Sequence, residues 1–198
     1  METKCFFLTP THRAILELRR YSSTKCPTPH GYHNATTNLG EVSTDYSGEA
    51  PPREYPKWPR ACECGYVFLD TDQWQQNKHT LYERSDGGAP TTLGEAPPGA
   101  MWYADWLLIR DPAPGLENYN RGPDGHCLMV RCPDGHDWCV DGQCNNCTMP
   151  TDYVHKCWVR HGTPPDITVD KNGNTCAAGA GSIQTRSWHG FLRNGVLA

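Results

Sequence analysis

Cysteine constrains what this chain can fold into more than any other residue type. The sequence holds 11 Cys and 9 His in 198 residues, whereas Leu, Ile, Val and Phe together number only 29. A core with so few aliphatic side chains needs support from aromatic residues, here 7 Trp and 9 Tyr, or from cross-links or metal ions. We therefore expect the cysteines to supply part of the stability of the fold.

Zinc ligation is the first interpretation of these cysteines. Their number is odd, so intramolecular disulfides alone would leave one thiol unpaired. The longest apolar run near the N-terminus, Cys5–Leu8, is too short for a signal peptide. We therefore expect a chain that stays in a reducing, cytosolic compartment, where clustered Cys interleaved with His favours zinc. Disulfides and buried free thiols are the alternatives.

The charge balance does not favour nucleic acid as a partner. The chain carries 18 Lys and Arg against 22 Asp and Glu, a formal net charge of −4. Residues 1–100 hold 10 basic and 12 acidic side chains, and residues 101–198 hold 8 and 10. Neither half has the basic excess that binds phosphate backbones. Because no apolar run is long enough for a bilayer either, we expect a protein partner and no membrane.

The N-terminal part predicts two short helices separated by an extended connector. Thr9–Tyr21 has a possible cap and a weak amphipathic pattern. Asp70–Tyr82 starts with an aspartate and has a glutamine three residues later, in the arrangement of a capping box. Residues 50–59 hold four prolines and are expected to be extended.

The C-terminal part predicts a β-meander or small barrel. Short apolar segments alternate there with turn residues such as Asn172-Gly173 and Asn194-Gly195. Pro-Asp-Gly-His occurs at residues 123–126 and again at 133–136, which indicates two successive hairpin ends. The expected strands are Met101–Arg110, Cys127–Arg131, Asp137–Val140, Tyr153–Arg160, Ile167–Asp170 and Trp188–Arg193.

These patterns together predict an α+β fold that is dominated by β-structure. We expect a small zinc-stabilised meander or barrel-like sheet with one or two short helices. Residues 1–100 would form an N-terminal zinc-knuckle-like region, and residues 101–198 a β-rich region containing Cys and His. The two regions could also be parts of one compact domain.

The first candidate metal site combines the Cys62-x-Cys64-Gly65-Tyr66 segment with an upstream cluster. A close Cys pair followed by glycine and an aromatic residue resembles a zinc knuckle, although the usual spacing of the pair is two residues rather than one. Cys26 with either His30 or His33 would complete a closed Cys3His site. The alternative is that the histidines are solvated and the cysteines are buried thiols.

The second candidate site is Cys144-x2-Cys147 followed by His155-x-Cys157. Residues two apart in a strand face the same way, so His155 and Cys157 would present two ligands to a metal held by the Cys144/Cys147 turn. Other cysteines compete for places in this site, and the sequence does not choose among them. The competitors are Cys176, Cys139, Cys132 and Cys127.

Catalysis is possible in two forms. One is a cysteine nucleophile with a histidine base and an aspartate that orients it; its candidates are Cys147 or Cys176, then His155, His161 or His189, then Asp137 or Asp141. The other is a zinc ion with an open water position, for which the candidate bases are Glu63 and Asp137. The sequence contains neither His-Glu-x-x-His nor a deaminase signature, which favours a structural role.

Several segments resemble known proteins. The chain resembles a group of bacteriophage-encoded Cys-rich hypothetical proteins over most of its length, through Cys62–Phe68, Pro97–Trp102, Gly122–Gly125, His155–Gly162, Val169–Gly173 and Cys176–Ile183. More distantly, Gly181–Ile183 followed by Trp188–Gly195 resembles the C-terminal motif of a bacterial Cys-containing domain of unknown function. The resemblance implies a phage context and brings no catalytic residues.

The sequence thus favours a phage-encoded zinc-binding accessory or virion-associated protein. It would act by binding a protein partner from the host or the virion, with zinc in a structural role. Its expected location is the host cytoplasm or the virion. The alternative is a zinc-dependent hydrolase or nuclease-like enzyme that acts in the infected cell.

Overall fold

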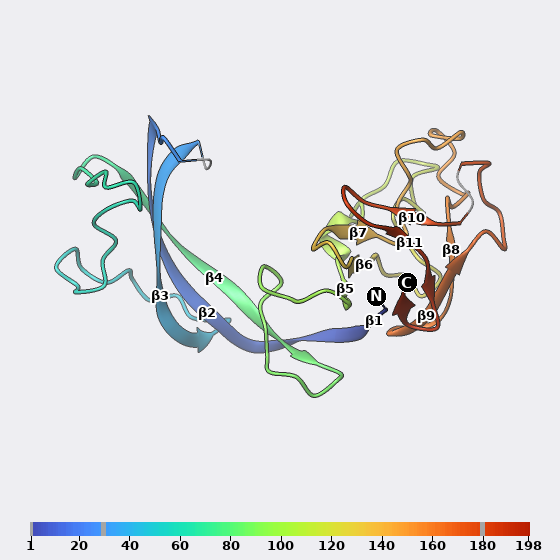
Figure 1. The fold of residues 1–198 in the computed structure, drawn as a ribbon, viewed down its shortest axis with the longest axis horizontal. Coiled ribbons are helices and arrows are strands. Elements are labelled where there is room, and N and C mark those ends of the chain that lie inside the picture. The colour runs from blue at the N-terminus through green and yellow to red at the C-terminus, as the bar shows by residue number, and fades with distance from the viewer. Residues whose placement is uncertain (1, 29–30, 179–180) are drawn as a thin grey trace. The chain divides into compact units, whose positions relative to one another are not determined.

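A computed structural model describes residues 2–28, 31–178 and 181–198 of the chain (Figure 1). Strands account for nearly all of its regular structure, so the prediction of a β-dominated fold is confirmed. Within the described part, the only helix is the short 3-10 helix η1 (Asp105–Leu107), and no helix has the length and apolar character to cross a membrane. The strands are β1 (Thr3–Lys4), β2 (Phe6–Lys25), β3 (Tyr32–Ser43), β4 (Gln73–Arg84), β5 (Ala100–Tyr103), β6 (Leu128–Arg131), β7 (Asp137–Cys139), β8 (Val159–Thr163), β9 (Asp166–Asp170), β10 (Ile183–Gln184), β11 (His189–Gly190), β12 (Leu192–Arg193) and β13 (Val196–Leu197).

The chain forms two compact units that are interleaved along the sequence. Unit 1 comprises Met1–Thr9, Arg84–Ala89 and Glu95–Ala198, and unit 2 comprises Pro10–Glu83 and Pro90–Gly94. Residues 1–9, which contain β1 and the start of β2, therefore belong to the same unit as the C-terminal part of the chain.

Unit 2 is built on the long strand β2, which lies between β3 and β4 (Figure 1). The helix expected at Thr9–Tyr21 is wrong, because this segment belongs to β2. Ala14, Leu16 and Leu18 are buried while the residues between them are more exposed, which is the period of two that a strand requires. The antiparallel pairing with β3 satisfies the backbone hydrogen bonds of this segment, and burial of the alternating face outweighs the weak helical pattern.

The helix expected at Asp70–Tyr82 is also wrong, because Gln73–Arg84 forms β4. Asp72 explains the local difference. Its carboxylate accepts hydrogen bonds from the N–H of Leu69 (2.7 Å) and the hydroxyl of Tyr66 (3.1 Å). Asp72 therefore closes a turn with the residues that precede it, and Asp70, the expected helix cap, forms an ion pair with Arg53 (2.9 Å) instead.

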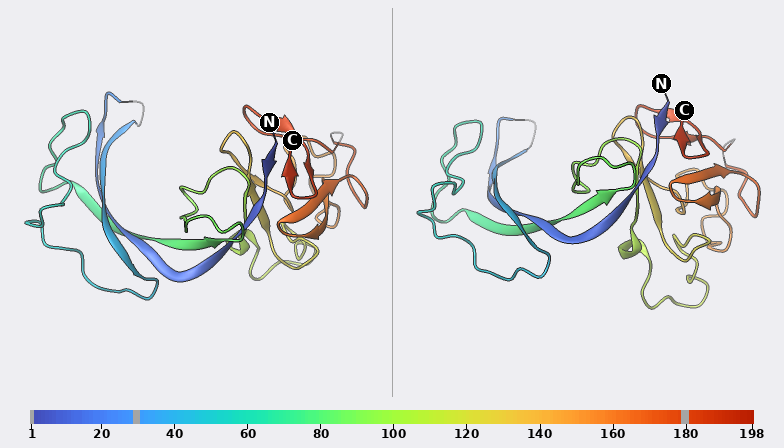
Figure 2. Two further views of the ribbon diagram at one scale, coloured as in Figure 1. Left: turned by 60° about the horizontal axis from the view of Figure 1, so that its bottom comes forward. Right: turned by 90° about the horizontal axis from the view of Figure 1, so that it is seen from below.

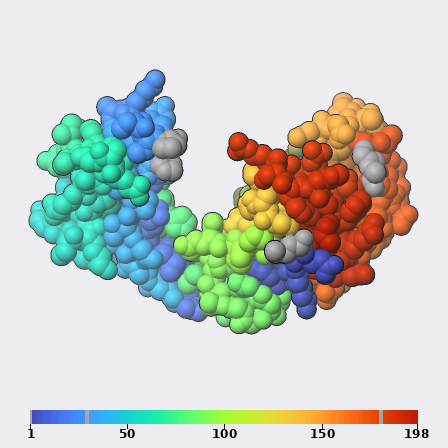
Figure 3. Space-filling model, viewed as in Figure 1, coloured from blue at the N-terminus to red at the C-terminus, as the bar shows by residue number. Residues whose placement is uncertain are grey.

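Unit 1 contains several small sheets. The start of β2 pairs with β5, and β5, β6 and β7 then follow as an antiparallel meander. β1, β13 and β12 form a second sheet, while β8–β9 and β10–β11 are two-stranded hairpins. Because β1 pairs with β13, the two ends of the chain lie side by side in both views of Figure 2, and the N-terminal residues (dark blue) lie against the C-terminal ones (red) in Figure 3.

The strand positions differ from expectation in three places. The expected strand Met101–Arg110 ends at Tyr103, because the 3-10 helix η1 occupies Asp105–Leu107. The expected strand Tyr153–Arg160 begins only at Val159, because the residues before it form turns around a Cys/His cluster. The expected strand Trp188–Arg193 is divided into β11 and β12, which pair with different partners.

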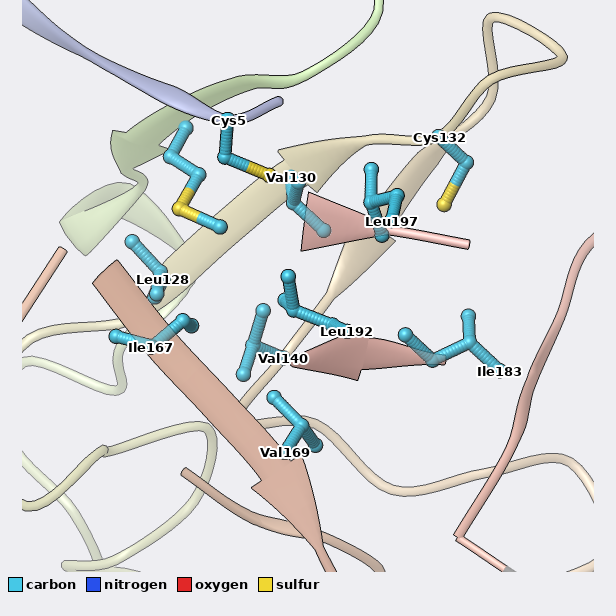
Figure 4. Close-up of a cluster of buried hydrophobic side chains, with 11 residues drawn as sticks. Cys5, Leu128, Val130, Cys132, Val140, Ile167, Val169, Ile183, Leu192 and Leu197 are labelled. Atoms are coloured by element: carbon cyan, nitrogen blue, oxygen red, sulfur yellow. The ribbon is translucent and has the colours of Figure 1, made fainter. Parts of the chain in front are cut away.

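The aliphatic residues of unit 1 gather in one core. Eleven buried residues form this cluster, with contributions from the β1–β2 junction and from β5, β6, β9, β10, β12 and β13. Figure 4 shows Val140, Ile167 and Leu192 pointing toward one another between these strands. The 0% exposure of Leu128, Ile167 and Leu192 indicates a dry, closely packed interior.

The two Pro-Asp-Gly-His segments form equivalent turns. In the first, the N–H of Gly122 donates to the carbonyl of His126, and in the second the N–H of Cys132 donates to that of His136 (both 2.8 Å). The second turn joins β6 to β7, as a hairpin end should.

The aspartate of each turn also binds a distant segment. Asp124 accepts hydrogen bonds from Tyr103 and from the buried Arg160, and these bonds lower the pKa of its carboxyl to about 2 although burial acts in the opposite direction. Asp134 accepts from the hydroxyls of Thr185 (2.6 Å) and Ser187 (3.2 Å) and from the N–H of Ser187 (3.1 Å). Each turn is therefore attached to the rest of unit 1 by one carboxylate.

Asp134→Asn should lower the free energy of unfolding by roughly 2 kcal/mol at pH 7, because a neutral amide has one acceptor oxygen in place of the two carboxylate oxygens that accept from Thr185, Ser187 and the N–H of His136. Urea denaturation followed by Trp fluorescence measures this difference. Asp137→Asn is the matched control. Asp137 is 37% exposed in its ion pair with Arg131, so its loss should cost less than about 1 kcal/mol.

The pH dependence of the same difference gives an independent test. Burial raises the pKa of Asp134, but hydrogen bonds from Thr185, Ser187 and the N–H of His136 hold it well below its usual range. A carboxyl whose pKa is lower in the folded than in the unfolded state stabilises the fold. This contribution is complete above the unfolded-state pKa of about 4 and is lost as the pH falls through the folded-state pKa. The gap between wild type and Asp134→Asn should therefore shrink from pH 7 to pH 3, and an unchanged gap would contradict this account.

Candidate metal centres

The first metal centre lies in unit 2, where the end of β2 and the start of β3 meet the turn at residues 61–67. The donor atoms of Cys26, His33, Cys62 and Cys64 all lie within 4.8 Å of one another. The Sγ atoms of Cys26 and Cys62 are 3.9 Å apart, and Cys64 Sγ is 3.2 Å from His33 Nδ1. Three sulfurs and one imidazole nitrogen at this separation form a donor set suited to a tetrahedral ion such as zinc.

The turn at Cys62 has the hydrogen bonds of a zinc knuckle despite its shorter Cys spacing. The N–H of Cys62 donates to the carbonyl of Tyr66 (2.8 Å), and the N–H of Gly65 donates to the carbonyl of Cys62 (2.9 Å). Gly65 has a φ of 90°, which side chains other than glycine rarely adopt. Hydrogen bonds lower the pKa of Cys62 to about 6. The largest contribution comes from the backbone N–H of Cys64, and the next from the His33 side chain.

His33 is the described histidine that joins this cluster. Its ring is 6% exposed and stacks on Tyr66 with a centroid distance of 4.0 Å and an interplanar angle of 9°. The packing holds the ring so that Nδ1 faces Cys64. His30, the other candidate, lies outside the described residues.

The second metal centre lies in unit 1 and contains Cys147, His155, Cys157 and Cys176, again with donor atoms within 4.8 Å of one another. His155 Nε2 is 3.2 Å from Cys147 Sγ and 3.8 Å from Cys157 Sγ, and Cys176 Sγ is 3.6 Å from Cys157 Sγ. His155 is 1% exposed. Its Nδ1 hydrogen-bonds to the carbonyl of Asp152, which leaves Nε2 as the nitrogen for the metal.

Cys176, rather than Cys144, supplies the fourth donor atom of this group. A parallel bridge between Lys156 and Thr175, with the N–H of Lys156 donating to the carbonyl of Asn174 (2.9 Å), places residue 176 beside residue 157. Cys144 is outside the group of four; it donates its backbone N–H to Cys157 Sγ (3.3 Å), and its side chain also hydrogen-bonds to Cys157. The sequence analysis identified Cys176 only as a competitor for this site, because no local sequence pattern indicates the bridge between Lys156 and Thr175.

Backbone N–H groups point at the sulfurs of the second centre as they do at the first. The N–H of Met149 donates to Cys147 Sγ (3.4 Å). Burial raises the pKa of Cys176, but the N–H groups of Ala178 and Thr148 outweigh it and lower that pKa to about 6. Burial raises the pKa values of Cys147 and Cys157 to about 11, so a cation is needed to hold all three thiols as thiolates.

Most of the side chains considered for catalysis have other partners, and Glu63 is exposed between Cys62 and Cys64. His161 Nε2 is 3.0 Å from Asp170, and His189 Nε2 is 2.9 Å from the Ser182 hydroxyl. Asp137 binds Arg131 through two hydrogen bonds, and Asp141 binds the buried Arg160. His155 alone among the proposed bases lies beside a candidate nucleophile, and there it faces several thiols at once.

The remaining cysteines lie outside both centres. Cys5 and Cys132 are buried in the aliphatic core of unit 1. Cys127 and Cys139 form a separate pair with their Sγ atoms 3.6 Å apart. No described cysteine is in a disulfide.

Comparison with known proteins identifies no relative, because no protein family, no curated protein and no solved structure matches this chain. The two Cys3His clusters are therefore the features from which a function can be argued.

We expect Cys176→Ser to lower the bound-metal content by one ion per chain, because it removes a donor atom of the second candidate centre. Cys64→Ser should likewise remove one ion from the first centre. Cys144→Ser is the matched control and should keep both ions, since Cys144 contributes a backbone N–H. Elemental analysis of the purified variants measures the outcome. Loss of metal in Cys144→Ser but not in Cys176→Ser would mean that Cys144, rather than Cys176, is the fourth ligand.

Proposed function

We propose that this protein is a zinc-stabilised β-scaffold that acts by binding a protein partner, and that zinc has a structural role. The observation that carries the proposal is that each Cys/His cluster offers four protein donor atoms. Structural zinc is closed by four protein ligands, whereas catalytic zinc keeps one position for water.

The composition of the two centres supports the structural role. Each contains three thiols and one imidazole. Thiolate-rich sites are typical of zinc that contributes folding free energy, on the order of 10 kcal/mol in small zinc modules. The buried thiols around each ion occupy the place that aliphatic side chains take in the core of unit 1.

A protein partner agrees with the surface chemistry of the chain. The net charge of −4 does not favour nucleic acid. Several large apolar side chains are exposed near the first centre, including Tyr32 (60%), Val67 (66%) and Leu69 (59%). Side chains of this kind are buried in protein interfaces.

We further propose a phage context, in which the protein is an accessory or virion-associated component located in the host cytoplasm or the virion. The support for this is the resemblance of segments such as Cys62–Phe68 and His155–Gly162 to bacteriophage-encoded Cys-rich proteins. The alternative, a zinc-dependent hydrolase or nuclease-like enzyme, requires an ion with an open coordination position.

Cobalt substitution separates the structural from the catalytic role. Protein loaded with Co²⁺ should show the intense visible absorption of tetrahedral thiolate coordination, and azide or thiocyanate should leave that spectrum unchanged because no water position is available. The Cys64→Ser and Cys176→Ser variants assign the absorption to one centre or the other. A spectrum that changes with added anion would indicate an open position and favour the enzyme.

The virion form of the proposal predicts that the protein is a component of purified phage particles. Quantitative mass spectrometry should detect its peptides at a constant ratio to the capsid protein through successive density gradients. A ratio that falls with each purification step would exclude a virion component and leave an accessory protein of the infected cell.

A further inference from the structure

Cys127 and Cys139 form a thiol pair that neither metal centre uses. Their Sγ atoms are 3.6 Å apart. Cys127 directly precedes β6 and Cys139 ends β7, the adjacent strand in Figure 1. In the antiparallel register Cys139 lies opposite Met129, two residues beyond Cys127, so the two thiols occupy diagonal positions on the same face of the hairpin.

The two sulfurs have different environments. Cys127 is 0% exposed, whereas Cys139 is only partly buried. The Cys127 side chain hydrogen-bonds to the Cys139 sulfur, and the backbone N–H groups of Asp141 and Gly142 also donate to it. These bonds lower the pKa of Cys139, while the same contact and burial raise that of Cys127.

Glycine at position 142 makes this arrangement possible. A Cβ atom placed there would lie 3.0 Å from the Cys139 sulfur. The absence of a side chain lets the backbone approach the sulfur closely. The Cys139 sulfur thus has the fixed backbone donors that stabilise a thiolate.

The carboxylate of Asp141, two residues after Cys139, disfavours a thiolate by its negative charge. That charge is balanced, because Arg160 Nε donates to both of its oxygens at 3.0 and 3.2 Å. Arg160 also binds Asp124, so the guanidinium is held in place beside Asp141.

A metal ion does not explain the pair. Within residues 2–28, 31–178 and 181–198, the groups of Cys, His, Asp and Glu donors that could hold an ion are the two centres described above, and neither includes Cys127 or Cys139. Two adjacent thiols of unequal acidity, one fully buried and the other on a partly exposed residue, are instead the arrangement of a dithiol that undergoes disulfide exchange.

We propose that Cys127 and Cys139 are a redox-active dithiol that reacts with low-molecular-weight disulfides of the glutathione type and closes into an intramolecular disulfide. The Cys139 thiolate attacks one sulfur of the small disulfide. The S–S bond of that molecule breaks, a mixed disulfide forms on Cys139, and the released thiolate takes up the proton that Cys139 lost.

The second step closes the pair. Cys127 loses its proton and attacks the Cys139 sulfur, and the second small thiolate leaves and takes up that proton. One small disulfide is reduced to two thiols, and the two cysteines are oxidised to one disulfide. The sulfurs, 3.6 Å apart in the dithiol, approach to the bonding distance of about 2 Å.

The test uses the zinc-loaded full-length protein and glutathione disulfide. After incubation, free thiols are alkylated and the intact mass, the peptide map and the zinc content are measured. We expect a loss of two hydrogens, a peptide pair linked through Cys127 and Cys139, and unchanged zinc. Because the zinc count is read in the same sample, failure of the dithiol and failure of the proposed structural zinc give different results.

Single variants test the order of the two steps. Cys127→Ser should stop at a mixed disulfide with one glutathione on Cys139. Cys139→Ser should react at least about tenfold more slowly, because the remaining thiol is buried. Cys132→Ala, at a buried core thiol of the same unit, is the matched control and should still form the Cys127–Cys139 bond. Circular dichroism of each variant establishes that it is folded.

Three results would overturn the proposal. The first is a folded, zinc-loaded wild-type protein that forms no disulfide. The second is oxidation confined to the metal-centre cysteines with release of zinc. The third is a third equivalent of metal that protects Cys127 and Cys139 from alkylation, which would make the pair part of a metal site.

Discussion

The convergence of thiols from distant parts of the chain is the constraint on which the rest of this structure depends. A comparison of clusters of buried residues shows this. The core of unit 1 is mainly aliphatic, but the cluster in unit 2 consists of Cys26, Cys62 and Phe68, and a third cluster consists of Cys157, Cys176 and Ala178. In the last two, the buried side chains are mostly those of the candidate metal ligands.

Such clusters hold together differently from an aliphatic core. Thiols contribute little apolar area, and thiolates packed beside one another repel. A divalent cation reverses the sign of that interaction, so metal binding and folding become a single equilibrium. The backbone N–H groups at Cys62, Cys147 and Cys176 act in the same direction, because they stabilise sulfur in its ionised form.

Local chemistry made part of this predictable from the sequence. The Cys62–Tyr66 turn and the two Pro-Asp-Gly-His turns depend on residues a few positions apart, and the structure has them where the sequence indicates. The β-dominated character follows from the alternation of short apolar segments and turn residues.

The errors arise where long-range pairing decides. Residues 9–21 and 70–82 carry weak helical signals, yet pairing of β2 with β3 and β4 gives each segment neighbours that an isolated helix lacks. The choice of Cys176 over Cys144 depends on the bridge between Lys156 and Thr175, which joins residues 19 positions apart. No periodicity within either segment encodes that contact.

The fate of each cysteine therefore depends on what surrounds its sulfur. Where an imidazole and other thiols converge, as around His33 and His155, the sulfur belongs to a donor set that could hold a metal ion. Where a thiol lies in the mainly aliphatic core of unit 1, as at Cys132, burial followed by the nearby carboxylates raises its pKa to about 12 and the residue acts as a small apolar side chain. Cys139 lies between these cases, because it has backbone donors and a single thiol neighbour but no imidazole. Those are the conditions under which sulfur exchanges its partner rather than binding an ion.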